Sequence, residues 1–232
     1  MATSQIFKRY QYVCTSRKHI LEMLEDRGFD ISELTEYTHD EIKTMLTSHT
    51  QGKFESKSEV GPLDIFLEKK NDNETGEKEK IYVKYRLDDK FKRTTNLQLQ
   101  ITEIFENLLT TKDTLIILNV GRVLIKPGAK EKPSEDFVNS LLSKGHFVQL
   151  FGLENFLFNV NRHVFVPKHR IISKKELHDF IEHYSCTLKN IPTIKRDDPQ
   201  AKYIGLRPKQ VCEITAVNLT SGTTVRYRIC VL

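Results

Sequence analysis

The chain has 232 residues, of which 38% are apolar and none is tryptophan, and a formal net charge of +5. Its longest purely aliphatic run, residues 115–118, is far shorter than the ~20 apolar residues that cross a bilayer, which excludes a membrane-spanning protein. Residues 1–13 lack the apolar region and cleavage site of a signal peptide, and the four cysteines form no closely spaced pair. The composition therefore predicts an intracellular protein with reduced thiols.

The first part of the chain predicts two opening helices. The first helix runs up to Gly28, since glycine is common directly after a helix C-terminus. A capping box from Thr38 to Glu41 begins the second helix, because the hydroxyl and the carboxylate each satisfy a free backbone N–H group. The polar residues 71–80 follow later and predict an exposed loop.

Beyond this loop, strand-like and helix-like patterns alternate. Strands are expected at 81–87, 114–120 and 146–151, and helices at 97–108 and 134–144. This alternation predicts a small, mainly parallel sheet, because helical crossovers join parallel strands.

The charge separates the chain into two parts. Residues 1–160 contain 23 basic and 25 acidic side chains, whereas residues 161–232 contain 13 and 6. The second part is therefore strongly basic, which favours contact with nucleic acid or with an acidic protein surface. We expect two domains, 1–160 and 161–232, with the boundary near residues 159–162.

The second part predicts an α+β module. A capping box from Ser173 to Glu176 begins a helix that extends to about residue 184. Asp198 suits an N-cap before Pro199, and Gly205 is expected to end this short helix. Residues 211–217 and 224–231 alternate as the two strands of a hairpin around residues 220–222.

The sequence contains little that indicates a metal site or a nucleotide-binding site. The histidine pairs, His163 with His169 and His178 with His183, do not have the spacing of two helical ligands and have no cysteine pair beside them. Phosphate-binding and esterase glycine motifs are absent. We therefore predict no metal and no other cofactor.

One pattern resembles a Mg²⁺-dependent nuclease. Asp64 and the segment from Glu68 to Lys70 match an aspartate followed by Glu-x-Lys, in which carboxylates bind the cation. Such residues normally lie on two adjacent strands, and three intervening residues leave no room for a turn. A charged strand edge is the simpler interpretation, and a nuclease stays an alternative function.

Two basic clusters are candidates for contact with phosphate groups, although a solvated charged face is the simpler explanation for such clusters, and the second cluster is the better candidate. The second contains Pro127 and Gly128, which place it on a turn that can reach a duplex backbone without reading bases. A free-standing DNA-binding protein is thus another alternative function. The clusters comprise Lys84, Arg86, Lys90, Lys92 and Arg93, and Arg122, Lys126, Lys130 and Lys132.

A set of short motifs carries a family resemblance. In order and spacing they resemble the fifth subunit shared by eukaryotic RNA polymerases I, II and III, whose C-terminal part is similar to an archaeal polymerase subunit. Lys209 replaces a glycine common in that family, Lys202 an arginine, and residues 71–80 are added length, which leaves a divergent or viral homologue open. The motifs are Leu21–Met23, Asp26–Phe29, Lys126–Ala129, Val166–His169, Ile191–Pro192, Asp198–Pro199, Tyr203–Leu206 and residues 221–228.

The resemblance implies a non-catalytic core subunit of a DNA-directed RNA polymerase. Its fold would be an α/β N-terminal jaw with a nuclease-like sheet, followed by the α+β assembly domain. Its partners would be the largest subunit, other core subunits and, weakly, downstream duplex DNA, with no membrane and no homo-oligomer. A nuclear location is expected, with the cytoplasm or a virion as the alternative for a viral polymerase.

The resemblance also implies site residues. Arg122, Lys126, Pro127 and Lys130 would lie near DNA. Tyr203 and Tyr227 are as well explained by packing within the module as by contact with a partner. The implied subunit interface comprises Pro167, Lys168, His169, Asp198, Pro199, Tyr203, Gly205, Tyr227 and Arg228.

Overall fold

The computed structural model describes residues 2–34, 37–51, 61–69, 78–86, 94–119, 133–218 and 222–232. The chain divides into two compact units, Met1–Phe158 and Asn159–Leu232. The chain is a mixed α/β protein with two small sheets. Within the described ranges, no helix is both long enough and apolar enough to cross a bilayer.

The first unit contains a four-stranded sheet in the order β1-β2-β3-β4. The β1–β2 pair is antiparallel, whereas β2–β3 and β3–β4 are parallel, as the alternation of strands and helices predicts. The elements are α1 (Ala2–Asp26), α2 (His39–Gln51), β1 (Ile65–Glu68), β2 (Lys80–Arg86), α3 (Thr94–Asn107), β3 (Thr114–Asn119), α4 (Pro133–Ser143), β4 (Phe147–Gly152) and the 3₁₀ helix η1 (Leu153–Phe156).

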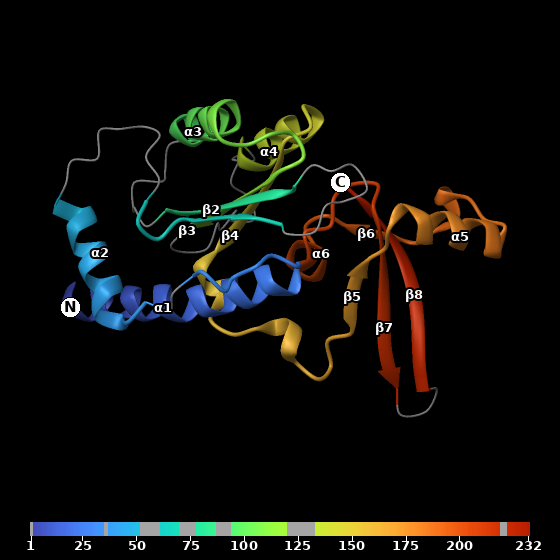
Figure 1. The fold of residues 1–232 in the computed structure, drawn as a ribbon, viewed down its shortest axis with the longest axis horizontal. Helices are drawn as coiled ribbons and strands as arrows, with labels where there is room; N and C mark the ends of the chain where they lie inside the picture. The colour runs from blue at the N-terminus through green and yellow to red at the C-terminus, as the bar shows by residue number, and fades with distance from the viewer. Residues whose placement is uncertain are drawn as a thin grey trace. The chain divides into compact units, whose positions relative to one another are not determined.

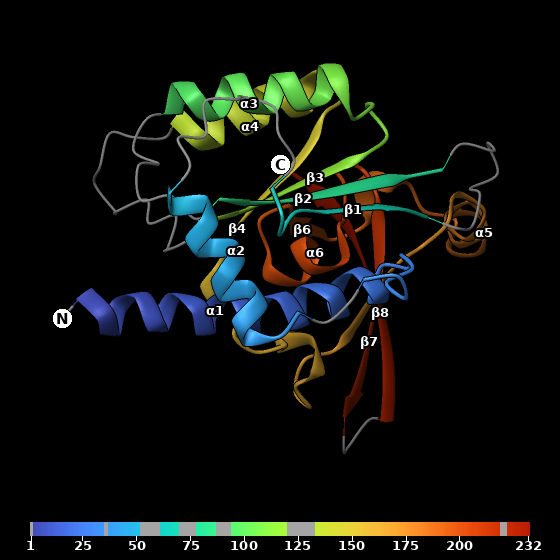
Figure 2. The same cartoon turned by 60° about the vertical axis from the view of Figure 1, so that its left-hand side comes forward.

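Helices cover both faces of this sheet. In Figures 1 and 2, α3 and α4 lie on one face and α1 on the other. Every residue of β3 is buried, which is typical of a strand between two helical layers. Ile101 of α3 packs with Leu115 and Ile117 on the first face, and α1 buries Ile20 and Met23 completely.

Local signals set the helix ends in this unit. Gly28, two residues after the end of α1, has a φ of +86°. The Thr38–Glu41 capping box forms, with the Thr38 N–H donating to Glu41 Oε2 at 2.8 Å. The expected polar loop at 71–80 ends too late, because Lys80 already belongs to β2 and pairs with Glu68 of β1. Residues 71–77 of that prediction lie outside the described residues.

The second unit also contains a four-stranded sheet, in the order β5-β7-β8-β6. Strands β5, β7 and β8 pair antiparallel, and β6 pairs parallel with β8. The elements are η2 (Val160–Arg162), β5 (Lys168–Ile171), α5 (Lys174–Tyr184), η3 (Leu188–Asn190), β6 (Thr193–Lys195), α6 (Pro199–Ile204), β7 (Val211–Asn218) and β8 (Gly222–Val231).

Two small cores lie on opposite faces of this second sheet. On one face, Ala201 and Leu206 from the α6 region pack on Cys212 and Cys230. On the other face, Phe180 of α5 packs against a core that contains Val211, so β7 and β8 run between α5 and α6 (Figure 1). All four cysteines are free, and burial raises the pKa of Cys212 and of Cys230 to about 11.

Candidate subunit interface

Asp198 and Gly205 define the short helix α6. The Asp198 carboxylate accepts the N–H groups of Gln200 at 2.9 Å and Ala201 at 3.3 Å. Pro199 follows as the first helical residue, and Gly205 ends the helix with a φ of +72°. These contacts confirm the predicted cap and give Asp198 and Gly205 a clear structural role.

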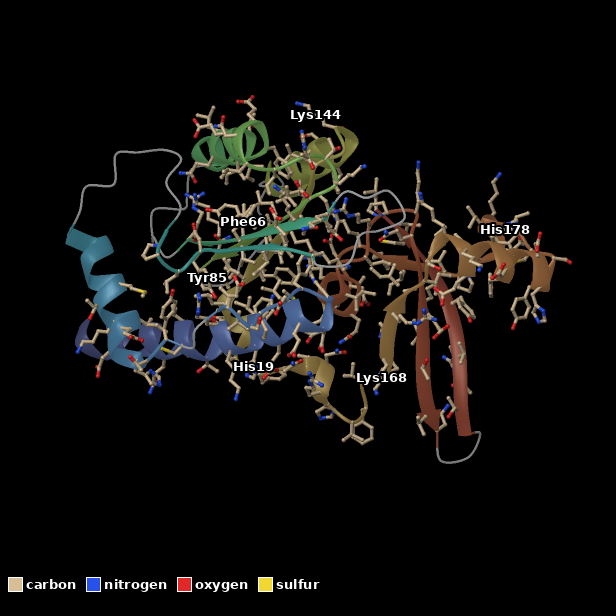
Figure 3. All side chains as sticks on the ribbon, in the orientation of Figure 1. His19, Phe66, Tyr85, Lys144, Lys168 and His178 are labelled. Carbon is tan, nitrogen blue, oxygen red and sulfur yellow. The ribbon has the colours of Figure 1, made fainter. Side chains whose placement is uncertain are left out.

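The segment that leads into β5 lies beside α6, because α6 packs against β5. The His169 Nδ1 donates to the Pro167 carbonyl oxygen at 2.8 Å, which orients the imidazole. Lys168 is exposed at the start of β5 (Figure 3). From α6, the Tyr203 hydroxyl accepts a hydrogen bond from Asn159 Nδ2 at 3.4 Å. The predicted interface residues of β5 and α6 therefore lie on neighbouring elements.

Arg228 and Tyr227 lie on opposite faces of β8. Arg228 is the cross-strand partner of Cys212, so its side chain is on the α6 face, where its Nη1 donates to the Thr193 carbonyl oxygen at 3.1 Å. The Tyr227 ring instead packs on Phe180 of α5, with the ring centroids 4.4 Å apart. This contact gives Tyr227 a packing role within the module.

A charged network on the α5 face was not predicted. Arg170 Nη1 donates to Glu176 Oε1 at 2.7 Å, and its Nη2 donates to Glu213 Oε2 at 3.0 Å. Tyr227 donates to the same oxygen of Glu213 at 3.2 Å. The Ser173 backbone N–H, the Arg170 guanidinium and the Ser173 hydroxyl lower the pKa of Glu176 to about 2. The capping box indicated Glu176, but no local pattern could pair Arg170 with Glu213.

The acidic side chains of the second unit are largely engaged within it. Glu182 pairs with His178 at 3.3 Å, and Asp197 lies 3.5 Å from Lys202 Nζ. Figure 3 shows His178 on the outer side of α5. Basic side chains outnumber acidic ones in this unit, and its exposed lysines include Lys168, Lys174, Lys175, Lys189 and Lys195.

The nuclease-like residues of the first unit do not form a common site. Asp64 accepts hydrogen bonds from Gly61 N–H, Tyr82 Oη and Tyr85 N–H at 2.7–2.8 Å, so its oxygens hold β1 to β2. Glu68 lies at the other end of β1, about 13 Å away by the rise per residue of a strand, and pairs with Lys80 at 3.1 Å. In the part of the chain that the structure describes, no three or more His, Cys, Asp or Glu residues gather as a possible metal site.

The structure describes only two residues of the predicted basic clusters. Lys84 and Arg86 belong to β2. The remaining members, among them the predicted DNA-proximal residues, lie outside the described residues: Lys90, Lys92, Arg93, Arg122, Lys126, Pro127, Lys130 and Lys132.

Comparison with known proteins identifies relatives of both units. The family model for the C-terminal domain of RNA polymerase Rpb5 matches residues 158–230, which is nearly the whole second unit. The DNA-directed RNA polymerase subunit Rpo5 of Archaeoglobus fulgidus is 39% identical over 74 residues, covering 32% of this chain and 97% of the archaeal protein.

Two eukaryotic relatives extend over most of the chain. The subunit rpabc1 of RNA polymerases I, II and III from Dictyostelium discoideum is 25% identical over 215 residues, covering 93% of this chain and 95% of the relative. Subunit 5B of RNA polymerases IV and V from Arabidopsis thaliana is 26% identical over 215 residues, covering 92% and 87%. The chain therefore belongs to the Rpb5/Rpo5 family of DNA-directed RNA polymerase subunits.

Proposed function

We propose that the chain is a non-catalytic core subunit that anchors on the largest polymerase subunit through residues 159–232. The main support is the archaeal relative, of which 97% aligns with only 74 residues of this chain. A polymerase subunit can thus consist almost entirely of the part that corresponds to the second unit. The two apolar cores of this unit supply the packing that such an independent module requires.

The proposed interface is the surface formed by the β5 entry and α6. Its exposed Lys168 and the excess of basic side chains in the unit favour an acidic partner surface, and such steering governs association rate and specificity more than affinity. Asp198 and Gly205 act indirectly by shaping α6. The residues proposed are Pro167, Lys168, His169, Asp198, Pro199, Tyr203, Gly205 and Arg228, with Tyr227 on the α5 face as a second, partly buried contact.

For the first unit we propose the role of a jaw near downstream DNA in a nuclear polymerase. Residues 1–160 have more acidic than basic side chains, so contact with the duplex should be weak and depend on the rest of the enzyme. Arg122, Lys126 and Lys130, beside Pro127, are the proposed phosphate contacts. Removing one such lysine should lower the salt slope of DNA binding by slightly less than one unit.

Affinity purification of the tagged full-length chain, followed by mass spectrometry, tests the proposed assembly role. We expect the two largest polymerase subunits to be recovered with the full chain and with residues 159–232, but not with residues 1–158. Recovery with residues 1–158 alone would show that the anchor lies in the first unit.

A nuclease assay tests the proposed absence of catalysis. We expect the purified chain to leave labelled duplex and single-stranded DNA intact in Mg²⁺ or Mn²⁺, because Asp64 is held by Tyr82 and backbone groups at the far end of β1 from Glu68. Cleavage that disappears in Glu68→Gln would overturn this part of the proposal.

A further inference from the structure

Two large apolar side chains project from the loop before β5. Val164 is 93% exposed and Phe165 is 88% exposed. Single exposed apolar residues are common on protein surfaces, but adjacent fully exposed ones indicate a contact surface. Both side chains would become more stable if a partner removed them from water.

The backbone around this pair is ordered by hydrogen bonds. The Val166 N–H donates to the His163 carbonyl oxygen at 3.0 Å, which closes a β-turn with Val164 and Phe165 at its corner. The Phe165 N–H donates to His163 Nδ1 at 3.3 Å, and the two rings are 5.6 Å apart. Turn corners usually carry glycine, proline, asparagine or aspartate, so local turn chemistry does not explain two apolar residues here.

The flanking segments fix the ends of this turn. Before it, the Asn159 side chain accepts the Asn161 N–H at 3.0 Å and begins η2. After it, Pro167 restricts the backbone, and its carbonyl oxygen accepts the bond from His169. A preformed loop loses little conformational entropy on binding, which favours affinity.

The sequence beside the turn is basic. Residues 161–170 contain Arg162, Lys168 and Arg170 and no acidic residue. Arg170 is paired with Glu176 and Glu213, so Arg162 and the exposed Lys168 carry the positive charge nearest the turn. A complementary partner site is therefore an apolar pocket with carboxylates at its rim.

We propose that the Val164–Phe165 turn is an apolar anchor that inserts into an acid-rimmed pocket of a neighbouring polymerase subunit. This inference rests on the proposed assembly function. It assigns a dominant share of the interface's binding energy to Val164 and Phe165, because an aromatic side chain in a partner's pocket commonly dominates binding. A protein pocket is favoured over a nucleic acid, because Val164 has no ring to stack on a base and both side chains need apolar surroundings.

The test uses the full-length chain and the polymerase core reconstituted without this subunit, with affinity measured by biolayer interferometry. Phe165→Ala should raise the Kd about tenfold or more, and Val164→Ser several-fold. Both side chains are exposed, so the melting temperature of each variant should match that of the unaltered chain. Lys168→Glu should lower the association rate and reduce its salt dependence.

Val217→Ser is the matched control, since Val217 is also a highly exposed valine, at 81%, but lies at the end of β7. We expect the control to bind as the unaltered chain does. The anchor proposal would be overturned if Phe165→Ala bound the core with unchanged affinity. It would also be overturned if Val164→Ser and Val217→Ser lost equal affinity for the core. If the unaltered chain itself fails to bind the core, the assembly proposal fails instead. Loss of single-stranded RNA or DNA binding in Phe165→Ala, with core binding retained, would identify the turn as a nucleic-acid contact and also overturn the inference.

Discussion

The backbone of Lys209 departs from the preference of its side chain. It has a φ of +72°, in the left-handed region that favours glycine, and its N–H donates to the Cys230 carbonyl oxygen at 2.9 Å. The family resemblance places a glycine at this position. The structure supplies the physical reason: the chain must turn here to enter β7, and a side chain adds steric strain.

Lys209→Gly should therefore stabilise the second unit, by about 0.5–1 kcal/mol, because relief of the strain exceeds the entropy that glycine adds to the unfolded chain. Urea unfolding of the full-length chain, followed by hydrogen exchange of β7 and β8 peptides, measures this change. Lys202→Gly is the matched control: it lies inside α6 and should destabilise by about 1 kcal/mol. Faster exchange in Lys209→Gly would contradict the explanation.

Among the elements, α5 combines partly buried apolar contacts, made by Leu177 and Phe180, with charged contacts at its first turn. None of its residues is fully buried, but its first turn has a complete capping box between Ser173 and Glu176. Arg170 then joins Glu176 to Glu213 and so ties the helix to β5 and β7. The contacts that tie α5 to β5 and β7 should therefore weaken as the pH falls.

The pKa of Glu176 is about 2 in the folded chain, below the ordinary value near 4.5. A carboxyl group whose pKa is lowered on folding adds stability above its unfolded pKa, and this contribution is lost as the pH falls toward the folded pKa. The stabilising effect of Glu176 should therefore be complete above about pH 5 and decline between pH 5 and pH 2.

Arg170→Gln should raise the pKa of Glu176 toward its ordinary value, although the bond from the Ser173 backbone N–H should keep it below that value. An NMR titration of the Glu176 carboxyl carbon measures the midpoint. Lys174→Gln removes a positive charge from the same helix and keeps the Arg170 contact, so its titration should change much less. Equal midpoints in the two variants would show that Arg170 has no specific effect.

At the scale of the whole molecule, the second unit has the features of an independently folding module. Its sheet carries a core on each face, its helices α5 and α6 have their own caps, and the archaeal relative is covered by little more than this unit. A domain of this size is only marginally stable, so both cores should be needed.

Residues 159–232, produced alone, should fold, with dispersed NMR amide signals and a cooperative thermal transition. Ala201→Ser offers a check on the α6 core, because Ala201 is fully buried there and a hydroxyl without a partner should destabilise the fragment by about 1–3 kcal/mol. A fragment that is unfolded by both measurements would show that the second unit depends on the first.

Several elements could be predicted from the sequence because their signals are local. The two capping boxes, the Asp198–Pro199 start of α6 and Gly205 at its end each act within a few residues, and all appear where expected. The α/β alternation likewise predicted the parallel strand pairs of the first sheet. The charged strand edge expected beside Asp64 corresponds to β1, whereas the short strands β5 and β6 could not be predicted, because strands of three or four residues exist through their pairing with distant ones.

The candidate interface was predicted as a set of residues but not as a surface. The order of the motifs along the chain carried the family resemblance. That resemblance grouped Pro167–His169 with Asp198–Gly205 as interface residues. Only the tertiary structure placed Tyr227 on the α5 face, away from Arg228, and joined Arg170 to Glu213. It also decided that Phe165 is exposed. Hydrogen bonds within a turn or cap are set by adjacent residues, whereas burial and long-range ion pairs depend on which faces the folded sheet brings together.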